Sequence, residues 1–163
     1  MPEGTTLHTQ TEFGSIEREL RIAATPEVVF DVVSQPAHIR EWWGAETDIE
    51  PVVGSTGELV WTSKTTGEQQ GEAISVVESD PPRSFSFRWV TPERAVPTPQ
   101  NSLLVTFALV PDGTGTRLRV TESGFREKGW EGAVLEEAYR QHCVGWDTHL
   151  PLLVDVAEQV AAR

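Results

Sequence analysis

The sequence predicts an α+β fold in which a curved antiparallel sheet of six to seven strands wraps around a long C-terminal helix, with two short helices after the first strand. Three observations predict it. Apolar residues alternate with polar ones in the first two thirds of the chain, whereas near the C-terminus they recur every three to four residues. Short turn sequences separate the alternating segments, which favours an antiparallel meander. One face of such a sheet must be covered, and the C-terminal helix is the one predicted element long enough to cover it.

The first structured segment is expected to be one strand followed by two short helices. Alternation over residues 15–22 predicts a half-buried strand. Thr25-Pro26-Glu27 then supplies a helix N-cap, a proline in the first turn and an acidic residue near the helix N-terminus. This helix ends at Gln35-Pro36, and a second one is expected from Ala37 to Trp43, where Gly44 stops it.

The middle of the chain is expected to consist of strands and turns. Residues 91–101 contain three prolines and should form a loop, and residues 111–115 have the composition of a hairpin turn. The strands are expected at Glu58–Ser63, Gly71–Ser79, Ser84–Val90, Leu103–Leu109 and Thr116–Ser123.

The last segment has the period of an amphipathic helix over roughly residues 131–161. Pro151 lies within this pattern. Because proline has no N–H group and its ring collides with the preceding turn, we expect it to kink the helix or divide it near residues 147–150.

Composition excludes several classes of partner. The formal charge is −12, which repels phosphate groups, so neither nucleic acid nor an anionic lipid surface is an expected partner. Acidic charge also keeps a small protein soluble, which favours a monomer or a weak homodimer. The single cysteine, Cys143, cannot form an internal disulfide and suits a reducing cytosol.

Domain organisation and location follow from the ends of the chain. Residues 1–14 are polar and aperiodic, so they are expected to form a flexible tail before a single domain over residues 15–163. Met1 to Gly4 lack the start of an export signal, which predicts a cytoplasmic protein. The most apolar segment, Leu150–Ala157, contains Pro151 and Asp155 and is too short for membrane insertion.

Several fragments, in this order and spacing, resemble one known family over about residues 15–160. They are Ala24-Thr25-Pro26-Glu27-Val28-Val29-Phe30, Ile39-Arg40-Glu41-Trp42-Trp43-Gly44, Gly57-Glu58-Leu59-Val60-Trp61, Pro82-Arg83-Ser84-Phe85, Thr121-Glu122-Ser123-Gly124-Phe125, and Gly145-Trp146 with Leu150 and Leu153. Together they resemble the START-like (SRPBCC) superfamily, and within it the branch related to the activator of the ninety-kilodalton heat-shock protein ATPase. The resemblance implies a helix-grip fold with a cavity between sheet and helix that takes apolar molecules. Family members include carriers, cyclases, hydrolases, co-chaperones and resistance proteins, and the fold alone does not choose among them.

Aromatic side chains are the first candidates for lining that cavity. Large planar rings offer area and stacking to a flat apolar ligand, although they also serve simply to fill a core. The candidates are Trp42, Trp43, Trp61, Phe87, Trp89, Phe107 and Trp146.

Four polar side chains are further candidates. Arg18 and Glu122 each share a strand face with apolar residues, and in the fold that the chain resembles the first and last strands are neighbours. A cross-strand ion pair at the cavity is therefore expected, unless a strand end or bulge turns either residue to solvent. His142 and His149 lie two helical turns apart, too far to share a metal ion, so no metal is expected. The sequence also has neither a phosphate-binding glycine loop nor a dinucleotide fingerprint, so no cofactor is expected. Either histidine could donate a hydrogen bond in the cavity or act as a general base.

The leading functional hypothesis is binding of an apolar or aromatic small molecule, lipid or polyketide-like, in this cavity. An enzyme of the cyclase or hydrolase type is an alternative, with Arg18, Glu122 or a histidine acting on the ligand. A related alternative is resistance to enediyne antibiotics by self-sacrifice, which needs an exposed glycine at the pocket mouth, such as Gly124 or Gly129. The family also suggests a co-chaperone that stimulates a heat-shock protein ATPase.

Overall fold

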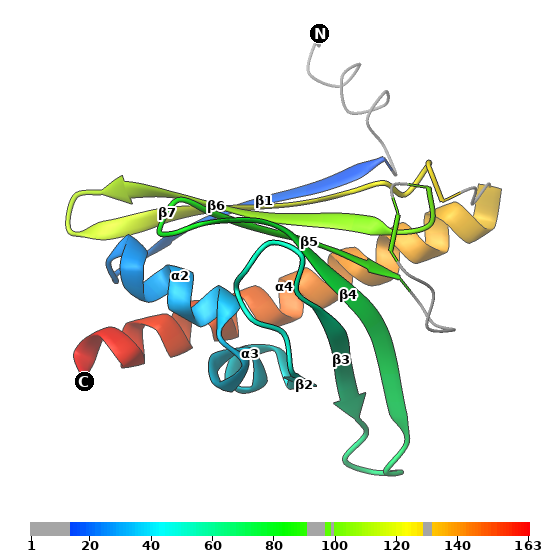
Figure 1. The fold of residues 1–163 in the computed structure, drawn as a ribbon, viewed down its shortest axis with the longest axis horizontal. Helices are drawn as coiled ribbons and strands as arrows, with labels where there is room; N and C mark the ends of the chain where they lie inside the picture. Colours follow the sequence, from blue (N-terminus) through cyan, green and yellow to red (C-terminus); the bar gives the residue numbers. More distant parts are fainter. Residues whose placement is uncertain (1–13, 91–96, 99, 129–131) are drawn as a thin grey trace, which may run out of the picture.

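The computed structural model describes residues 14–90, 97–98, 100–128 and 132–163. It contains one curved sheet, two short helices and one long helix (Figure 1). The elements in chain order are β1 (Ser15–Ile22), α2 (Pro26–Ser34), α3 (Pro36–Trp43), β2 (Ala45–Thr47), β3 (Thr56–Thr62), β4 (Gln69–Asp80), β5 (Ser84–Val90), β6 (Leu103–Asp112), β7 (Gly115–Ser123) and α4 (Gly132–Ala162).

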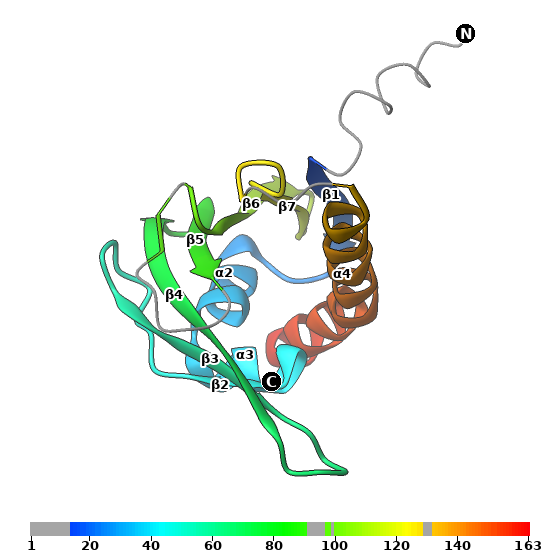
Figure 2. The same cartoon turned by 90° about the vertical axis from the view of Figure 1, so that its right-hand side faces the viewer.

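The sheet has seven antiparallel strands in the order β1-β7-β6-β5-β4-β3-β2. Only the first strand is out of sequence order, because β1 pairs with β7 along its whole length. Figure 2, which looks along the long helix, shows the sheet curling around one side of the molecule while α4 lies along its open side. This arrangement confirms the predicted helix-grip fold. Among the described strands, the three-residue strand β2 is the one that the sequence analysis does not predict.

Local signals place the two short helices as predicted. The Thr25 hydroxyl caps α2 by accepting a hydrogen bond from the N–H of Val28 (3.3 Å). Gly44 ends α3 with φ of 75°, a left-handed conformation that glycine adopts without strain. The abrupt end of α3 leaves Trp42 and Trp43, its last two residues, buried between the sheet and α4.

The long helix α4 is continuous through Pro151, so the expectation that this proline divides it is wrong. Leu150 and Leu153, on either side of the proline, are both buried, whereas Pro151 itself is exposed. Packing of these leucines offsets the lost backbone hydrogen bond, which costs on the order of 3 kcal/mol in an exposed helix. Nearer the C-terminus, the Glu158 carboxylate accepts a hydrogen bond from the N–H of Ala23 (2.9 Å) and ties α4 to the end of β1.

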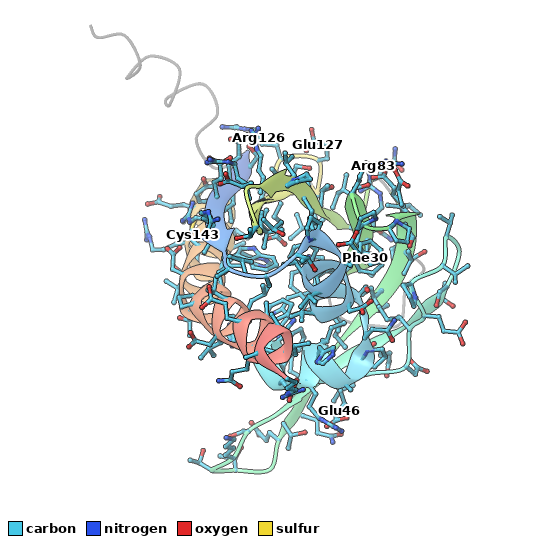
Figure 3. All side chains as sticks on the ribbon, turned by 90° about the vertical axis from the view of Figure 1, so that its left-hand side faces the viewer. Phe30, Glu46, Arg83, Arg126, Glu127 and Cys143 are labelled. Atoms are coloured by element: carbon cyan, nitrogen blue, oxygen red, sulfur yellow. The ribbon has the colours of Figure 1, made fainter. Side chains whose placement is uncertain are left out.

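Aliphatic and aromatic side chains together fill the space between sheet and helices. Phe85, Phe87 and Phe107 point inward from β5 and β6 and are almost fully buried, as is Trp42. Figure 3 shows side chains occupying this interior. The hollow is therefore much smaller than the gap between the ribbons. Within the described residues, no helix is long and apolar enough to span a membrane.

Two neighbouring leucines on α4 test which face of the helix packs against the core. Leu153 is 0% exposed and Leu152 is 44% exposed. We expect Leu153→Ala to lower the free energy of unfolding by about 2–5 kcal/mol, because it leaves a cavity under the helix. Leu152→Ala should change it by less than about 0.5 kcal/mol. Urea unfolding followed by circular dichroism measures both, and equal effects would contradict this packing.

Candidate ligand-binding site

A single buried carboxylate organises the inner end of the site. Glu122 lies on β7 and is 0% exposed. The indole N–H of Trp89 donates to its Oε2 (2.8 Å), and the indole N–H of Trp146 donates to its Oε1 (2.7 Å). Nδ1 of His142 lies 3.0 Å from both oxygens. The carboxylate therefore has three donors, as a buried charge requires.

These three donors come from both layers of the fold. Trp89 lies on β5, two strands away from Glu122, so their hydrogen bond spans β6 on the concave face. His142 and Trp146 lie one turn apart on α4. The Glu122 carboxylate thus joins the middle of the sheet to the covering helix through side-chain hydrogen bonds.

The same carboxylate sets the protonation of His142. Burial lowers the pKa of this imidazole, but the hydrogen bond from Nδ1 to Glu122 and the negative charges of Glu122 and Glu72 outweigh burial. Lys128 acts weakly in the opposite direction, and the net result is a pKa above the ordinary value of 6.5. Because a carboxylate can only accept, Nδ1 carries a hydrogen in either protonation state.

A cavity of about 350 Å³ opens next to this carboxylate, between strands β3 to β5 and α4. Indole rings from four elements, α3, β3, β5 and α4, form much of its surface, and amide, carboxylate and imidazole groups line it as well. Its lining residues are Trp43, Trp61, Gln70, Glu72, Trp89, Gln141, His142, Gly145, Trp146 and His149. A second hollow, of about 660 Å³, lies along the β3–β4 hairpin and shares Trp61 and Gln70 with the first.

The indole rings that line the cavity hold one another in place. Trp43 lies at their centre, with its ring centroid 5.3 Å from that of Trp89, 5.4 Å from Trp146 and 5.7 Å from Trp61. Trp42 stacks on Trp43, with 4.8 Å between the ring centroids and an angle of 8° between the ring planes. The indole N–H of Trp61 donates to the backbone carbonyl of Trp43 (3.0 Å). Fixed aromatic surfaces of this kind bind flat molecules without first being ordered.

The structure brings most of the predicted site residues together. Six of the eleven line the cavity, namely Trp43, Trp61, Trp89, His142, Trp146 and His149. Trp42, Phe87 and Phe107 lie behind this layer in the core, and Glu122 lies beneath it as the hydrogen-bond acceptor. Arg18 lies elsewhere.

The predicted ion pair between Arg18 and Glu122 is wrong. Arg18 is opposite Val120 in the β1–β7 register, and its guanidinium donates to the Asp147 carboxylate on α4 (2.8 and 3.2 Å). Strand β1 is at the sheet edge beside α4, so the long side chain reaches the helix rather than the interior. Cys143, which Figure 3 labels, lies on the part of α4 that runs beside β1.

Four lining residues were missed by sequence reasoning: Gln70, Glu72, Gln141 and Gly145. Alternation along β4 could have found two of them, because Gln70 and Glu72 share a strand face with buried Ile74. Gly145 could also have been identified from the sequence. Glycine within a helix is destabilising by about 1 kcal/mol relative to alanine, so its presence in the predicted helix indicates a position where a side chain would interfere with packing or binding. A Cβ atom added at Gly145 would meet no atom within 4 Å outside the neighbouring backbone of its own helix.

Of the two glycines suggested for an enediyne reaction, Gly124 is not among the residues that line the cavity. Gly124 is half-buried, and a Cβ atom there would be 3.0 Å from the Ser102 carbonyl oxygen, so this backbone is packed away from the cavity. Gly129 lies outside the described residues. Gly145 is the glycine that lines the cavity.

Comparisons with known proteins agree with this architecture. A family model described as Activator of Hsp90 ATPase homolog 1-like protein matches residues 23–158. A search of curated proteins gave no match. Protein MLL2253 from Mesorhizobium loti is 25% identical, with a TM-score of 0.70 over 89% of this chain and 97% of its own.

Two other solved structures are similar at lower identity, which shows the fold alone. Aha1 from Colwellia psychrerythraea, solved as a dimer, is 22% identical, with a TM-score of 0.64 over 88% of this chain and 96% of its own. DynU16, a protein of the dynemicin biosynthetic locus, is 18% identical, with a TM-score of 0.67 over 91% of this chain and 48% of its own.

Replacing the buried carboxylate should lower the pKa of His142. In Glu122→Gln the burial of the imidazole remains, while the charge that offsets it is lost. NMR titration of the histidine ring protons measures this pKa in both proteins. The ring resonances of His38, which bonds Glu41 on α3, serve as the internal control. An unchanged pKa for His142 would show that Glu122 does not set it.

The raised pKa also predicts how stability depends on pH. Stabilisation by the His142–Glu122 pair should be complete below the unfolded-state pKa, about 6.5, and should be lost as pH rises through the folded-state pKa. The free energy of unfolding of the wild-type protein, minus that of Glu122→Gln, should therefore be larger at about pH 6 than at about pH 9. Urea unfolding at both pH values measures it, and a difference that grows with pH would contradict the pairing.

Proposed function

Because the chain belongs to the Activator of Hsp90 ATPase homolog 1-like family, we propose that it binds a flat aromatic or other apolar small molecule in the cavity between β3–β5 and α4. The observation that carries the proposal is the group of four indoles, Trp43, Trp61, Trp89 and Trp146, gathered around one open cavity. Aromatic walls with a few convergent polar groups are the usual composition of small-molecule sites.

The size of the cavity limits the ligand. Its volume of about 350 Å³ is near the lower end of the range for ligand sites, roughly 300–1,000 Å³. A molecule of two or three fused rings fits this space better than a long lipid chain. Larger ligands could extend along Trp61 and Gln70 into the adjoining hollow.

Hydrogen-bonding groups at the cavity would orient such a ligand. Gln70 and Gln141 offer amides from opposite sides, on β4 and α4. Nδ1 of His149 is 2.9 Å from the Gly145 carbonyl oxygen and so carries a hydrogen, which leaves Nε2 as an acceptor when the ring is neutral.

One observation favours an enzyme of the hydrolase or cyclase type as a second candidate. His142 lines the cavity while the buried Glu122 carboxylate holds its Nδ1. Carboxylate-oriented imidazoles act as general acids or bases in many active sites. Mass spectrometry of bound compounds after long incubation tests this, with His142→Gln as the control. Products formed by the wild-type protein but not by the variant would support it, whereas compounds recovered unchanged would oppose it.

Filling the cavity from the helix side should block ligand binding without unfolding the protein. Gly145 lines the cavity, and a Cβ atom at this position meets no neighbouring atom within 4 Å outside its own helix backbone. We therefore expect Gly145→Phe to weaken binding of neutral aromatic compounds such as 1-naphthalenemethanol by about tenfold or more, equal to about 1.4 kcal/mol. Tryptophan fluorescence or equilibrium dialysis measures the affinity.

The neighbouring position supplies a matched control. Val144 is 60% exposed on α4, so Val144→Phe adds the same ring outside the cavity and should bind like the wild-type protein. Thermal unfolding confirms that both variants are folded. If Gly145→Phe bound as tightly as Val144→Phe, or if the wild-type protein bound none of a panel of neutral two- and three-ring aromatics, the proposed site would be wrong.

A further inference from the structure

We propose that the ligand of this cavity presents a carbonyl oxygen to Nε2 of His142, as a flat aromatic ketone or quinone would; this rests on the binding function proposed above. The imidazole of His142 lines the cavity, whereas Glu122, which bonds its other nitrogen, is completely buried. One nitrogen of the ring therefore serves the fold, and the other is left for a ligand.

Glu122 determines which nitrogen is left. Nδ1 of His142 lies 3.0 Å from both carboxylate oxygens. Because a carboxylate only accepts, Nδ1 keeps its hydrogen and the ring gains or loses a proton at Nε2. The two nitrogens of an imidazole point in different directions, so Nε2 is directed away from Glu122. Within the described residues, Nε2 has no hydrogen-bond partner.

Aromatic neighbours hold the imidazole in this orientation. Its ring centroid lies 5.7 Å from that of Trp89 and 5.3 Å from that of Phe125, and both rings are nearly perpendicular to it. These two neighbours are buried, whereas the side chain of His142 is 27% exposed. A donor that is already fixed and accessible loses little conformational freedom when it bonds a ligand.

The charged groups around the ring decide whether Nε2 donates. Burial lowers the pKa of His142, but Glu122 on β7 and Glu72 on β4 raise it, Lys128 opposes them weakly, and the result is above 6.5. His149 is a further titratable group on α4 at the cavity. Below the pKa of His142, Nε2–H donates to a carbonyl oxygen. Above it, Nε2 presents a lone pair that repels the same oxygen.

Charge favours a neutral acceptor over a carboxylate ligand. The positive charge of a protonated His142 is already paired with Glu122 at 3.0 Å. The formal charge of −12 on the whole chain repels an anion. A carbonyl oxygen brings no charge to the cavity and still gains from a charged donor, because such hydrogen bonds are stronger than those between neutral groups.

Two naphthalene probes of the same shape isolate the carbonyl group. They are 2-acetylnaphthalene and 2-isopropenylnaphthalene, in which C=O is replaced by C=CH2. Affinities for the full chain are measured by tryptophan fluorescence and equilibrium dialysis. The ratio of ketone to alkene affinity should fall by about tenfold between about pH 6 and about pH 9, as Nε2 loses its hydrogen. The alkene accepts no hydrogen bond and corrects for shape and apolar contact.

NMR titration of the wild-type protein gives a second measurement that needs no variant. Since the ketone binds the protonated imidazole better, its binding must in turn favour protonation. The pKa of His142 should therefore be higher in the ketone complex than in the alkene complex.

Two histidine variants test which ring is responsible. His142→Asn keeps an amide N–H near the position of Nδ1 for Glu122 but removes Nε2, so at about pH 6 the affinity ratio should fall by about tenfold. His149→Asn is the matched control. Nδ1 of His149 is bonded to the Gly145 carbonyl (2.9 Å), so its neutral ring offers an acceptor, and the ratio and its pH dependence should persist. Thermal unfolding confirms that both variants are folded.

The outcomes distinguish this inference from the function on which it rests. An affinity ratio that does not change with pH, or equal pKa values of His142 in the two complexes, would overturn the inference while the aromatic site stands. A ratio that depends on His149 rather than His142 would also overturn it. Failure of both probes to bind would overturn both proposals.

Discussion

The buried carboxylate of Glu122 is the constraint on which the interior depends. A charge that is removed from water is tolerated only with several hydrogen-bond donors, and removing one partner of a buried ionic group typically costs about 3–5 kcal/mol. Trp89, His142 and Trp146 are those donors. Their indole and imidazole rings are consequently held in fixed orientations, and the long helix is fixed relative to strands β5 and β7.

The small cavity follows from this arrangement. Two indoles bonded to Glu122 pack against Trp43, which stacks on Trp42, so the described side chains are closely packed at the inner end of the site. The cavity lies beside these rings, where Gly145 brings no side chain to the helix surface. The proposed ligand site is thus an aromatic surface bordered by polar groups, and under this proposal those polar groups determine its selectivity.

Sequence periodicity predicted most of the fold and part of the site. Strand β5 and helix α4 were predicted closely because their apolar residues follow one clear period, whereas β2 is too short, at three residues, to show any period. A period identifies the face of a strand but not the element that covers it. For that reason Glu122 was correctly placed inward but paired with the wrong partner, and the polar Glu72 was overlooked.

Indole N–H resonances offer the most direct test of an aromatic binding site beside Glu122. In a ¹⁵N-labelled sample titrated with 1-naphthalenemethanol, the signals of Trp43, Trp61, Trp89 and Trp146, the four indoles that line the cavity, should shift in a saturable manner. The signal of Trp42 should change far less, because its N–H is bonded to the Val32 carbonyl in the core (2.8 Å). Saturable shifts of those four indoles without a comparable shift of Trp42 would support the site, whereas spectra that stay unchanged at saturating probe, or that move uniformly, would contradict it.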